Sequence, residues 1–247
     1  MNKNSNIYIV VYSVVMVAVV ATLLAVTALS LQSRQQANEL GEKKQAILNS
    51  LGAESQDYDI FITAEVFDAE GRPVEGEDVF ALLNDLPAAF KAGRFPLFEA
   101  QDGRVVIPVT GSGLWGPIWG YVALERDMNT VAGIIMDHKG ETPGLGAEIT
   151  TPKYQAKFVG KSIFEGDEFV SVTLRKGGAK DPAHDVDAIS GGTKTSDGVT
   201  AMLKGSLHNY LPVLNARRAA AAAPAAEAAG TEAEAIMCND ENGENHE

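Results

Sequence analysis

Twenty-five consecutive residues near the start of the sequence carry no charge, and this segment limits the possible folds more than any other feature. It runs from Ile7 to Leu31, with Lys3 before it and Arg34 after it. At about 1.5 Å of rise per helical residue, a segment of this length spans the roughly 30 Å hydrocarbon layer of a bilayer. The apolar region of a cleaved secretory signal is shorter, about 7–15 residues. The sequence therefore predicts a single transmembrane helix, with residues 1–33 as the anchor.

The orientation of this anchor does not follow from its flanking charges. Lys3 stands on one side, and Arg34, Lys43 and Lys44 stand on the other. Basic residues tend to stay on the cytoplasmic side, but large domains cross a membrane despite so small a bias. The charge pattern alone leaves the orientation open.

Composition excludes several classes of function. The chain has 20 Lys and Arg against 33 Asp and Glu, a formal charge of −13, which repels the phosphates of nucleic acids. A single cysteine, Cys238, cannot form an intramolecular disulfide or a cysteine-based metal site. The four histidines are scattered, and no Ser-His-Asp or Cys-His arrangement stands out. We expect no nucleic acid partner, no metal site and no catalytic side chain, so any chemistry needs an organic cofactor.

The segment 34–56 predicts a juxtamembrane helix, because its apolar residues recur at roughly helical spacing and Gly52 suits a C-terminal cap. Those apolar residues are Leu40, Ile47, Leu48 and Leu51.

The segment 57–215 mixes strand and helix patterns without a regular alternation of the two. The predicted strands are 59–67, 104–110, 118–124, 130–138 and 168–174. The predicted helices are 78–90, 152–159 with Thr151 as its cap and Pro152 in its first turn, and a helix from Val199 that Pro212 ends. This mixture predicts an α+β domain built on a largely antiparallel sheet.

The remaining residues, 216–247, form an alanine-rich and then acidic tail. The tail holds seven acidic residues and has few large apolar side chains. Too little apolar surface is present to offset the entropy of ordering, so we expect disorder there. Cys238 lies in this tail and is read as an incidental thiol.

The segment from Asp187 to Val199 is the most informative for chemistry. It is rich in hydroxyl groups, contains Gly191 and Gly192, and leads into a helix. The N–H groups at a helix start attract anions, glycines let a phosphate approach the main chain, and Lys194 adds a positive charge. An ordinary Ser or Thr cap before a surface helix has the same pattern, and spacing alone does not separate the two readings.

This segment resembles the flavinylation motif of flavoprotein subunits in sodium- and proton-linked electron-transfer complexes. The matching positions are Asp187, Ser190 and Thr193, followed by a Thr-Ser pair that begins at Thr195. The resemblance implies that FMN is joined to Thr193 by a phosphodiester bond. It also implies that the cofactor site includes Asp187, Ser190, Gly191, Gly192, Lys194 and Thr195.

The chain departs from this motif at one position, because the family usually has alanine where Gly192 stands. We read glycine there as a tolerated small residue with negative φ. On that reading, Gly192→Ala leaves the turn unchanged or stabilises it.

A second motif, from His138 to Ile149, resembles the Glu-Thr-Pro-Gly-Leu-Gly loop of the same family. Taken alone it also suits a connecting turn. The resemblance implies that Glu141, Thr142 and Leu145 contact the flavin, and that Lys176, in the turn 175–179, lies nearby.

A third stretch, 107–124, resembles the C-type flavoprotein subunits of sodium-translocating NADH:quinone reductases rather than the shorter G-type subunits of Rnf-type complexes. Its two tryptophans, Trp115 and Trp119, are read as core or interface residues.

The resemblance implies a flavoprotein subunit that relays electrons between NADH and ubiquinone during sodium export. It implies an inner-membrane location with the N-terminus in the cytoplasm and the flavin domain outside. The implied partners are the other subunits of the complex, membrane lipid, and a flavin transferase that uses FAD. The alternatives are a G-type electron-transfer flavoprotein of an Rnf-type complex and a membrane-anchored assembly module without covalent flavin.

Overall fold

The structure is a computed structural model, and it describes residues 6–221. The chain forms two compact units, one up to Gln45 and one from Ala46 onward.

The first unit consists of helix α1 up to Gln45. The helix as a whole spans Asn6–Ser50, so its last turn lies in the second unit. Among the described residues, α1 is the one helix long and apolar enough to cross a membrane, with a mean hydropathy of 2.8 in its most apolar window. The expected juxtamembrane helix at 34–56 is not a separate element. Residues 34–50 continue α1, and the helix ends at Ser50 rather than at residue 56.

The second unit begins at Ala46, which corrects the expected domain start at residue 57. The last turn of α1 belongs to the domain because Ile47 is 0% exposed and Leu48 is also buried. Gly52 ends this turn with φ +65°, and its N–H donates to the carbonyl of Asn49 at 3.1 Å. Glycine adopts this left-handed conformation without steric cost, so Gly52 acts as the C-terminal cap that the sequence predicts.

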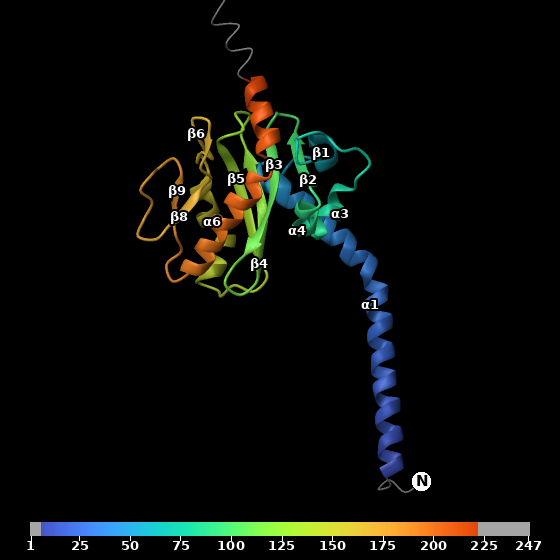
Figure 1. Cartoon of the computed structure of the whole chain (residues 1–247). Coiled ribbons are helices and arrows are strands. Elements are labelled where there is room, and N and C mark those ends of the chain that lie inside the picture. The colour runs from blue at the N-terminus through green and yellow to red at the C-terminus, as the bar shows by residue number, and fades with distance from the viewer. Residues whose placement is uncertain (1–5, 222–247) are drawn as a thin grey trace, which may run out of the picture. The chain divides into compact units, whose positions relative to one another are not determined.

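A five-stranded antiparallel sheet forms the centre of the domain, which confirms the predicted α+β class (Figure 1). Its strands follow one another in space as they do in sequence. They are β1 Ile62–Phe67, β2 Phe95–Ala100, β3 Val105–Ser112, β4 Pro117–Leu124 and β5 Val131–His138.

The β1–β2 side of the sheet differs from the sequence prediction in two ways. Strand β2 is not among the predicted strands, and it contains Pro96, which lacks an N–H. Only Phe98 and Glu99 of β2 pair with β3, so Pro96 breaks no ladder on that side. The first three residues of the expected strand 59–67 belong instead to the short helix α2, Tyr58–Phe61, capped by the Asp57 side chain.

Both faces of the sheet are buried. Neighbouring residues of a strand point to opposite faces, so one strand contributes to the cluster on each face. In β3, Val105, Ile107 and Val109 join one hydrophobic cluster, and Val106 joins the other. Helix α6 packs against the first face (Figure 1). The end of α1 supplies Ile47 and Leu48 to the cluster on the second face.

Asp and Thr side chains cap the shorter helices. The expected helix 78–90 is two helices, α3 Val79–Asn84 and α4 Leu86–Lys91, capped by Asp78 and Asp85 respectively. The expected helix 152–159 is α5 Pro152–Gln155 followed by the 3₁₀ turn η2 Ala156–Phe158, with Thr151 as the predicted cap. Another 3₁₀ turn, η1 Gly146–Thr150, precedes Thr151.

Four short strands lie outside the main sheet. Strands β6 Phe164–Glu165 and β7 Glu168–Phe169 form one antiparallel pair, and β8 Thr173–Arg175 and β9 Asp185–Asp187 form a parallel pair. The expected strand 168–174 is therefore split between β7 and β8. Ser171, with φ +64°, turns the chain between them.

Helix α6 spans Thr193–His208, and a further helix covers residues 211–221. Pro212 lies in the first turn of this further helix, where its missing N–H costs no hydrogen bond. The prediction that Pro212 ends a single helix is therefore wrong, as is disorder at residues 216–221. The rest of the expected tail, with Cys238 and His246, lies outside the described residues.

Candidate functional site

The start of α6 presents a free helix terminus. Gly192 is the N-cap residue, with φ −109°, and no side chain caps the helix. Within residues 6–221, the backbone N–H groups of Thr193, Lys194 and Thr195 donate no hydrogen bond. Gly191 has φ +74°, a conformation that favours glycine. This end of α6 therefore offers three unpaired donors and the positive end of the helix dipole beside the half-buried Thr193.

Ser196 holds the turn before α6 in shape. Its hydroxyl donates to the carbonyl of Gly192 at 3.0 Å and accepts the N–H of Ile189 at 3.0 Å. Both hydroxyl interactions are buried, so the Ile189–Gly192 turn is fixed on the side away from solvent. The second residue of the Thr-Ser pair is thus structural.

Thr195 links α6 to the loop that follows β5. Its hydroxyl donates to Oε2 of Glu141 at 2.6 Å, and Oε1 of Glu141 accepts the N–H of Trp115 at 2.9 Å. Glu141 is only 5% exposed. One carboxylate therefore joins the two sequence motifs and the turn between β3 and β4.

The protonation state of Glu141 depends on opposing effects. Burial raises the pKa of the carboxyl. The hydrogen bonds from Thr195, Trp115 and Leu114, together with the nearby His138, lower the pKa by more than burial raises it. The net pKa is below the usual value, so Glu141 is a buried carboxylate anion at neutral pH. The backbone N–H of Glu141 donates to Nδ1 of His138 at 3.1 Å, which fixes the loop at its first residue.

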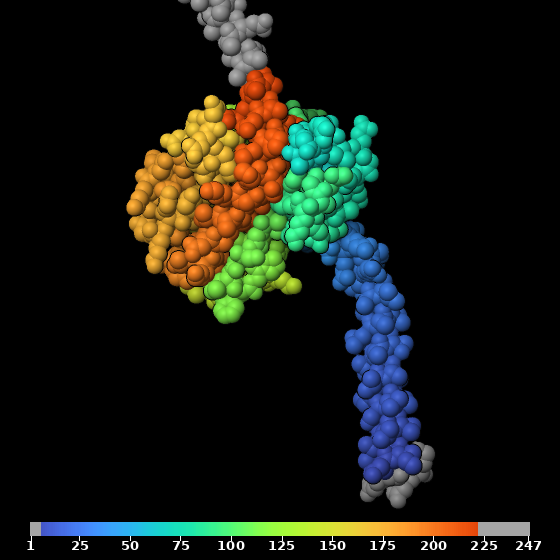
Figure 2. Space-filling view, viewed as in Figure 1, coloured from blue at the N-terminus to red at the C-terminus, as the bar shows by residue number. Residues whose placement is uncertain are grey.

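Two glycines make room for this carboxylate. A β-carbon at Gly113 would collide with Oε1 of Glu141, and one at Gly146 would collide with Oε2. Two more glycines let α6 approach β3, because a β-carbon at Gly111 would lie 2.6 Å from the β-carbon of Met202, and one at Gly198 would strike the carbonyl oxygen of Ser112. Figure 2 shows this first part of α6 (orange) at the surface beside the turn that joins β3 and β4 (green).

Large apolar side chains are exposed in the turn between β3 and β4 and in the loop after β5. Leu145 is 42% exposed, and its Cδ2 lies 2.6 Å from where a β-carbon of Gly191 would stand. Trp115 is 68% exposed, although its backbone N–H donates to Glu141. The prediction that this tryptophan is a core residue is therefore wrong. Leu114 is also exposed. Exposed large apolar groups beside free N–H donors suit a ligand with an aromatic part and an anionic part.

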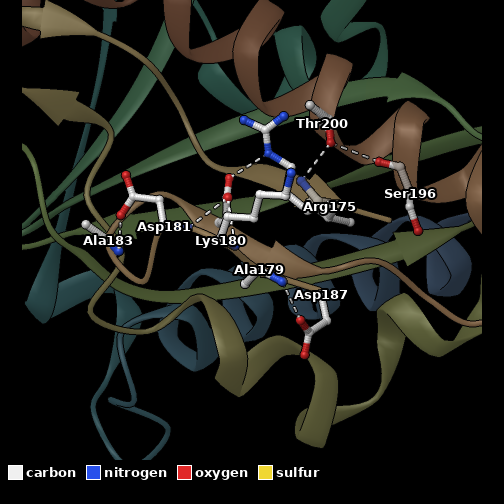
Figure 3. Close-up of polar contacts among 10 residues, drawn as sticks. Arg175, Ala179, Lys180, Asp181, Ala183, Asp187, Ser196 and Thr200 are labelled. Carbon is white, nitrogen blue, oxygen red and sulfur yellow. Dashed lines mark hydrogen bonds and ion pairs between the residues drawn. The ribbon is translucent and has the colours of Figure 1, made fainter. Parts of the chain in front are cut away.

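Asp187 anchors the loop between β8 and β9 (Figure 3). Its Oδ1 accepts the N–H of Ala179 at 2.8 Å, its Oδ2 lies 3.9 Å from Nζ of Lys157, and its carbonyl accepts the hydroxyl of Tyr154 at 3.0 Å. Two residues earlier in β9, buried Asp185 accepts from Nε of Arg175 in β8 at 3.0 Å. Asp187 therefore orders the protein beside the candidate site through contacts with the chain itself.

Lys176 borders a groove of about 500 Å³ along α6. The groove is lined by Thr173, Leu174, Arg175, Lys176, Lys180, Asp197, Thr200, Ala201 and Lys204. Thr193 shares one helical face with Asp197, Thr200 and Lys204, because residues three, four, seven and eleven positions apart lie on one side of a helix. Lys176 is thus across the groove from the face on which Thr193 lies, and does not join the Glu141 cluster.

Three other expected site residues, Thr142, Ser190 and Lys194, are exposed. The carbonyl of Thr142 accepts the N–H groups of Leu145 and Ala147, both at 3.1 Å, and so closes the loop. The structure thus brings together Glu141, Leu145, Gly191, Gly192 and Thr195, while Asp187 and Lys176 lie on the β8–β9 side.

Sequence reasoning missed four residues of this arrangement: Gly113, Trp115, Gly146 and Ser196. Their signal was present, since each lies within a quoted motif, but spacing does not reveal which side chain meets which. In the part of the chain that the structure describes, no group of three His, Cys, Asp or Glu residues is placed to hold a metal ion.

Comparison with known proteins agrees with this geometry. Residues 113–208 match the family model described as an FMN-binding domain. The chain is 41% identical over 130 residues to the C subunit of the Na(+)-translocating NADH-quinone reductase of Neisseria meningitidis serogroup A, covering 50% of this chain and 49% of that protein. It is 30% identical over 210 residues to the corresponding C subunit of Vibrio vulnificus, covering 73% of this chain and 82% of that protein.

Two crystal structures have the same fold. The C subunit of the Na(+)-translocating NADH-quinone reductase from Parabacteroides distasonis aligns with a TM-score of 0.68 at 41% identity, covering 74% of this chain and 96% of that one. The Shewanella oneidensis NqrC aligns with a TM-score of 0.62 at 25% identity, covering 74% and 99%. The match to the Neisseria protein spans about half of that protein, but the matches to the Vibrio and Parabacteroides proteins span most of theirs. The chain therefore belongs to the family formed by the C subunits of Na(+)-translocating NADH-quinone reductases.

Proposed function

We propose that this chain is a membrane-anchored flavoprotein subunit of a sodium-translocating NADH:quinone reductase, with FMN joined to Thr193 by a phosphodiester bond. The observation that carries the proposal is the uncapped start of α6. There, the half-buried Thr193 lies beside N–H groups that have no acceptor among the described residues. A phosphate is the ligand that such a terminus favours.

The residues around Thr193 fit the phosphate end of FMN. Gly191, with φ +74°, and the buried Gly192 put no side chain between Thr193 and the loop that contains Leu145. Lys194 is exposed and adds a positive charge on the next residue. Ser196 and Thr195 are buried with their hydroxyls hydrogen-bonded to the protein, which leaves Thr193 as the available hydroxyl of this helix turn.

The exposed apolar side chains fit the ring end of the same cofactor. Leu145 and Trp115 both offer large exposed apolar surfaces within the matched domain. Leu145 lies next to the Gly191 turn. A bound flavin supplies one- and two-electron redox chemistry, while the protein fixes its position and its electrostatic surroundings. No side chain of this chain needs to act as a catalytic residue.

The wider role rests on the relatives. They carry the name of a sodium-translocating NADH-quinone reductase subunit, and α1 provides a membrane anchor by length and composition. We place the chain in a bacterial inner membrane with the N-terminus in the cytoplasm and the flavin domain outside. There it would relay electrons from NADH towards ubiquinone with the other subunits. During maturation a flavin transferase moves FMN from FAD to Thr193: the hydroxyl oxygen bonds to the FMN phosphorus, the pyrophosphate bond of FAD breaks, and AMP leaves with the proton of the hydroxyl.

Intact-mass spectrometry tests the attachment. The full chain is made in cells with and without a flavin transferase, and the wild type is expected to gain the mass of one FMN less one water only when the transferase is present. Thr193→Ala is expected to gain none. Thr63→Ala, at an exposed threonine of β1, is the matched control and should load fully. A flavin adduct on Thr193→Ala, or none on the wild type, contradicts the proposal.

A reporter fusion tests the orientation. Alkaline phosphatase fused after residue 221 is active only outside the cytoplasm, so activity is expected there. The same fusion to a chain without residues 1–33 should be inactive. Activity of a cytoplasmic reporter at the same position would reverse the proposed orientation.

A further inference from the structure

The buried carboxylate of Glu141 ties three separate segments to one another. Its Oε2 accepts the hydroxyl of Thr195 at the start of α6, and its Oε1 accepts the N–H of Trp115 between β3 and β4. Glu141 itself lies in the loop after β5, where its N–H donates to His138. A single side chain thus connects the two motifs that surround Thr193.

This carboxylate is poorly accessible to a ligand. It is 5% exposed, and both oxygens already accept hydrogen bonds from the protein. Gly113 and Gly146 enclose it so closely that a β-carbon at either position would overlap it.

The helix geometry shows what the link to Thr195 accomplishes. Successive residues of an α-helix are about 100° apart, so Thr193 and Thr195 differ by about 200° around the axis. Thr195 is 1% exposed and points to Glu141, whereas Thr193 is half-buried at the helix start. Holding Thr195 inward therefore holds Thr193 on the outward side.

We propose that Glu141 is a positioning residue for flavin attachment, which acts through Thr195 to fix the first turn of α6 with the Thr193 hydroxyl outward. This inference rests on the proposed function. It gives Glu141 a role different from the direct flavin contact that the family resemblance implies. The carboxylate touches neither the attacking oxygen nor the phosphate, and its effect is on the orientation of the acceptor helix.

The test measures the rate of flavin attachment to the full-length chain in detergent, with a purified transferase and FAD. Thr195→Val removes the hydroxyl but keeps the shape of the side chain. It is expected to lower the maximal rate at least about ten-fold, because the bond it removes is made to a buried charge. The concentration of the chain at half-maximal rate should stay within about two-fold, since the surface is unchanged.

Thr195→Ser restores the hydroxyl and is expected to recover the wild-type rate within about two-fold. Circular dichroism and melting temperature are recorded for each variant, so that slow attachment is separated from unfolding. A folded Thr195→Val chain that gains flavin at the wild-type rate would overturn the proposal. So would a Thr195→Ser chain as slow as Thr195→Val.

Glu141→Gln provides a second variant, because glutamine fits the same enclosure and keeps one acceptor oxygen. Its attachment rate is expected to fall about three-fold, and the double variant Glu141→Gln with Thr195→Val should be no slower than Thr195→Val alone. Two residues that act through one hydrogen bond do not give additive effects. Additive losses, or a wild-type rate for Glu141→Gln, contradict the role of Glu141.

The two proposals fail in different ways. If the wild type gains no flavin, or Thr193→Ala keeps it, the proposed function fails. If those two proteins behave as expected but the Thr195 and Glu141 variants match the wild type, only the positioning role fails.

Discussion

The hydroxyl oxygen of Ser196 lies 3.0 Å from the carbonyl oxygen of Gly192, one helical turn earlier in the chain. The same hydroxyl accepts the N–H of Ile189, also at 3.0 Å. One buried side chain thus satisfies both ends of the turn that leads into α6. The shape of the turn before Thr193 depends on a residue that follows it.

Ser196→Ala is expected to destabilise the domain by about 1–3 kcal/mol, because the buried N–H of Ile189 is left without an acceptor. The free energy of unfolding is measured by urea denaturation of the detergent-solubilised chain. Ser190→Ala is the matched control, since Ser190 is exposed on the same turn, and its effect should stay within about 0.5 kcal/mol. Equal effects of the two substitutions would refute this account of the turn.

Gly192→Ala is expected to lower stability by about 1 kcal/mol or more, contrary to the expectation from sequence. The negative φ of −109° is as predicted and accepts alanine. The obstacle is space, because a β-carbon would lie 2.9 Å from Cγ2 and 3.1 Å from Cβ of Ile189. The branch methyl of a buried isoleucine has little freedom to move aside.

Gly205→Ala is the control for that substitution, because Gly205 lies within α6 and a β-carbon there would meet nothing within 4 Å. It is expected to raise the free energy of unfolding by about 0.4–1 kcal/mol. Thermal melting of both variants gives the signs directly. A higher melting temperature for Gly192→Ala would show that Ile189 repacks without cost.

Asp185 is expected to make the stability depend on acid pH. Burial raises the pKa of its carboxyl, but the N–H groups of Asp181 and Lys180 and the guanidinium of Arg175 outweigh burial and lower the pKa below its usual value. A lowered folded-state pKa adds stability above the usual Asp value of about 4, and this contribution is lost as the pH falls through the folded-state pKa.

The substitution Asp185→Asn is therefore expected to cost about 1.5–3 kcal/mol at pH 7. The difference from wild type should shrink as the pH falls below about 4. Urea denaturation across this pH range measures it, with exposed Asp197→Asn as the control at pH 7. A difference that is the same at every pH would show that the charge of Asp185 does not contribute.

The domain is expected to need residues before 57, where the sequence places its start. A chain of residues 34–221 should fold and remain soluble, whereas residues 57–221 should not fold. The shorter chain lacks Ile47, Leu48 and Leu51, which are buried in the second hydrophobic cluster. Each such side chain contributes about 1.5–3 kcal/mol of burial, comparable together with the whole stability of a domain.

Circular dichroism and gel filtration of the two truncated chains provide the measurement. A cooperative melt for residues 57–221 would show that the last turn of α1 is dispensable.

Local sequence patterns were sufficient wherever one segment determines its own conformation. The charge-free segment from Ile7 to Leu31 predicted a membrane-length helix, Thr151 and Pro152 predicted the start of α5, and Gly52 predicted the end of α1. The alternation of apolar residues predicted β3, β4 and β5 within one or two residues of their ends. These features depend on rise per residue, hydrogen bonding at helix ends and alternation, all of which are properties of neighbouring residues.

Sequence patterns failed where a distant segment decides the outcome. Residues 95–100 were not predicted as a strand, yet β2 forms because β1 pairs along its whole length. Pro212 looked like a helix end but starts the helix 211–221, and Ile47 looked like part of a stalk but packs beneath the sheet.

The candidate site divides in the same way. The sequence by itself determined that a glycine turn containing Thr193 leads into a helix, because turn and helix signals are local. It placed the helix from Val199, whereas α6 begins at Thr193. Only the tertiary structure decided that Thr195 meets Glu141, 54 positions away, and that Gly113 and Gly146 leave room for the carboxylate. The physical reason is that a contact between side chains depends on how β3, β5 and α6 pack, and packing is fixed by the whole buried core rather than by any segment of it.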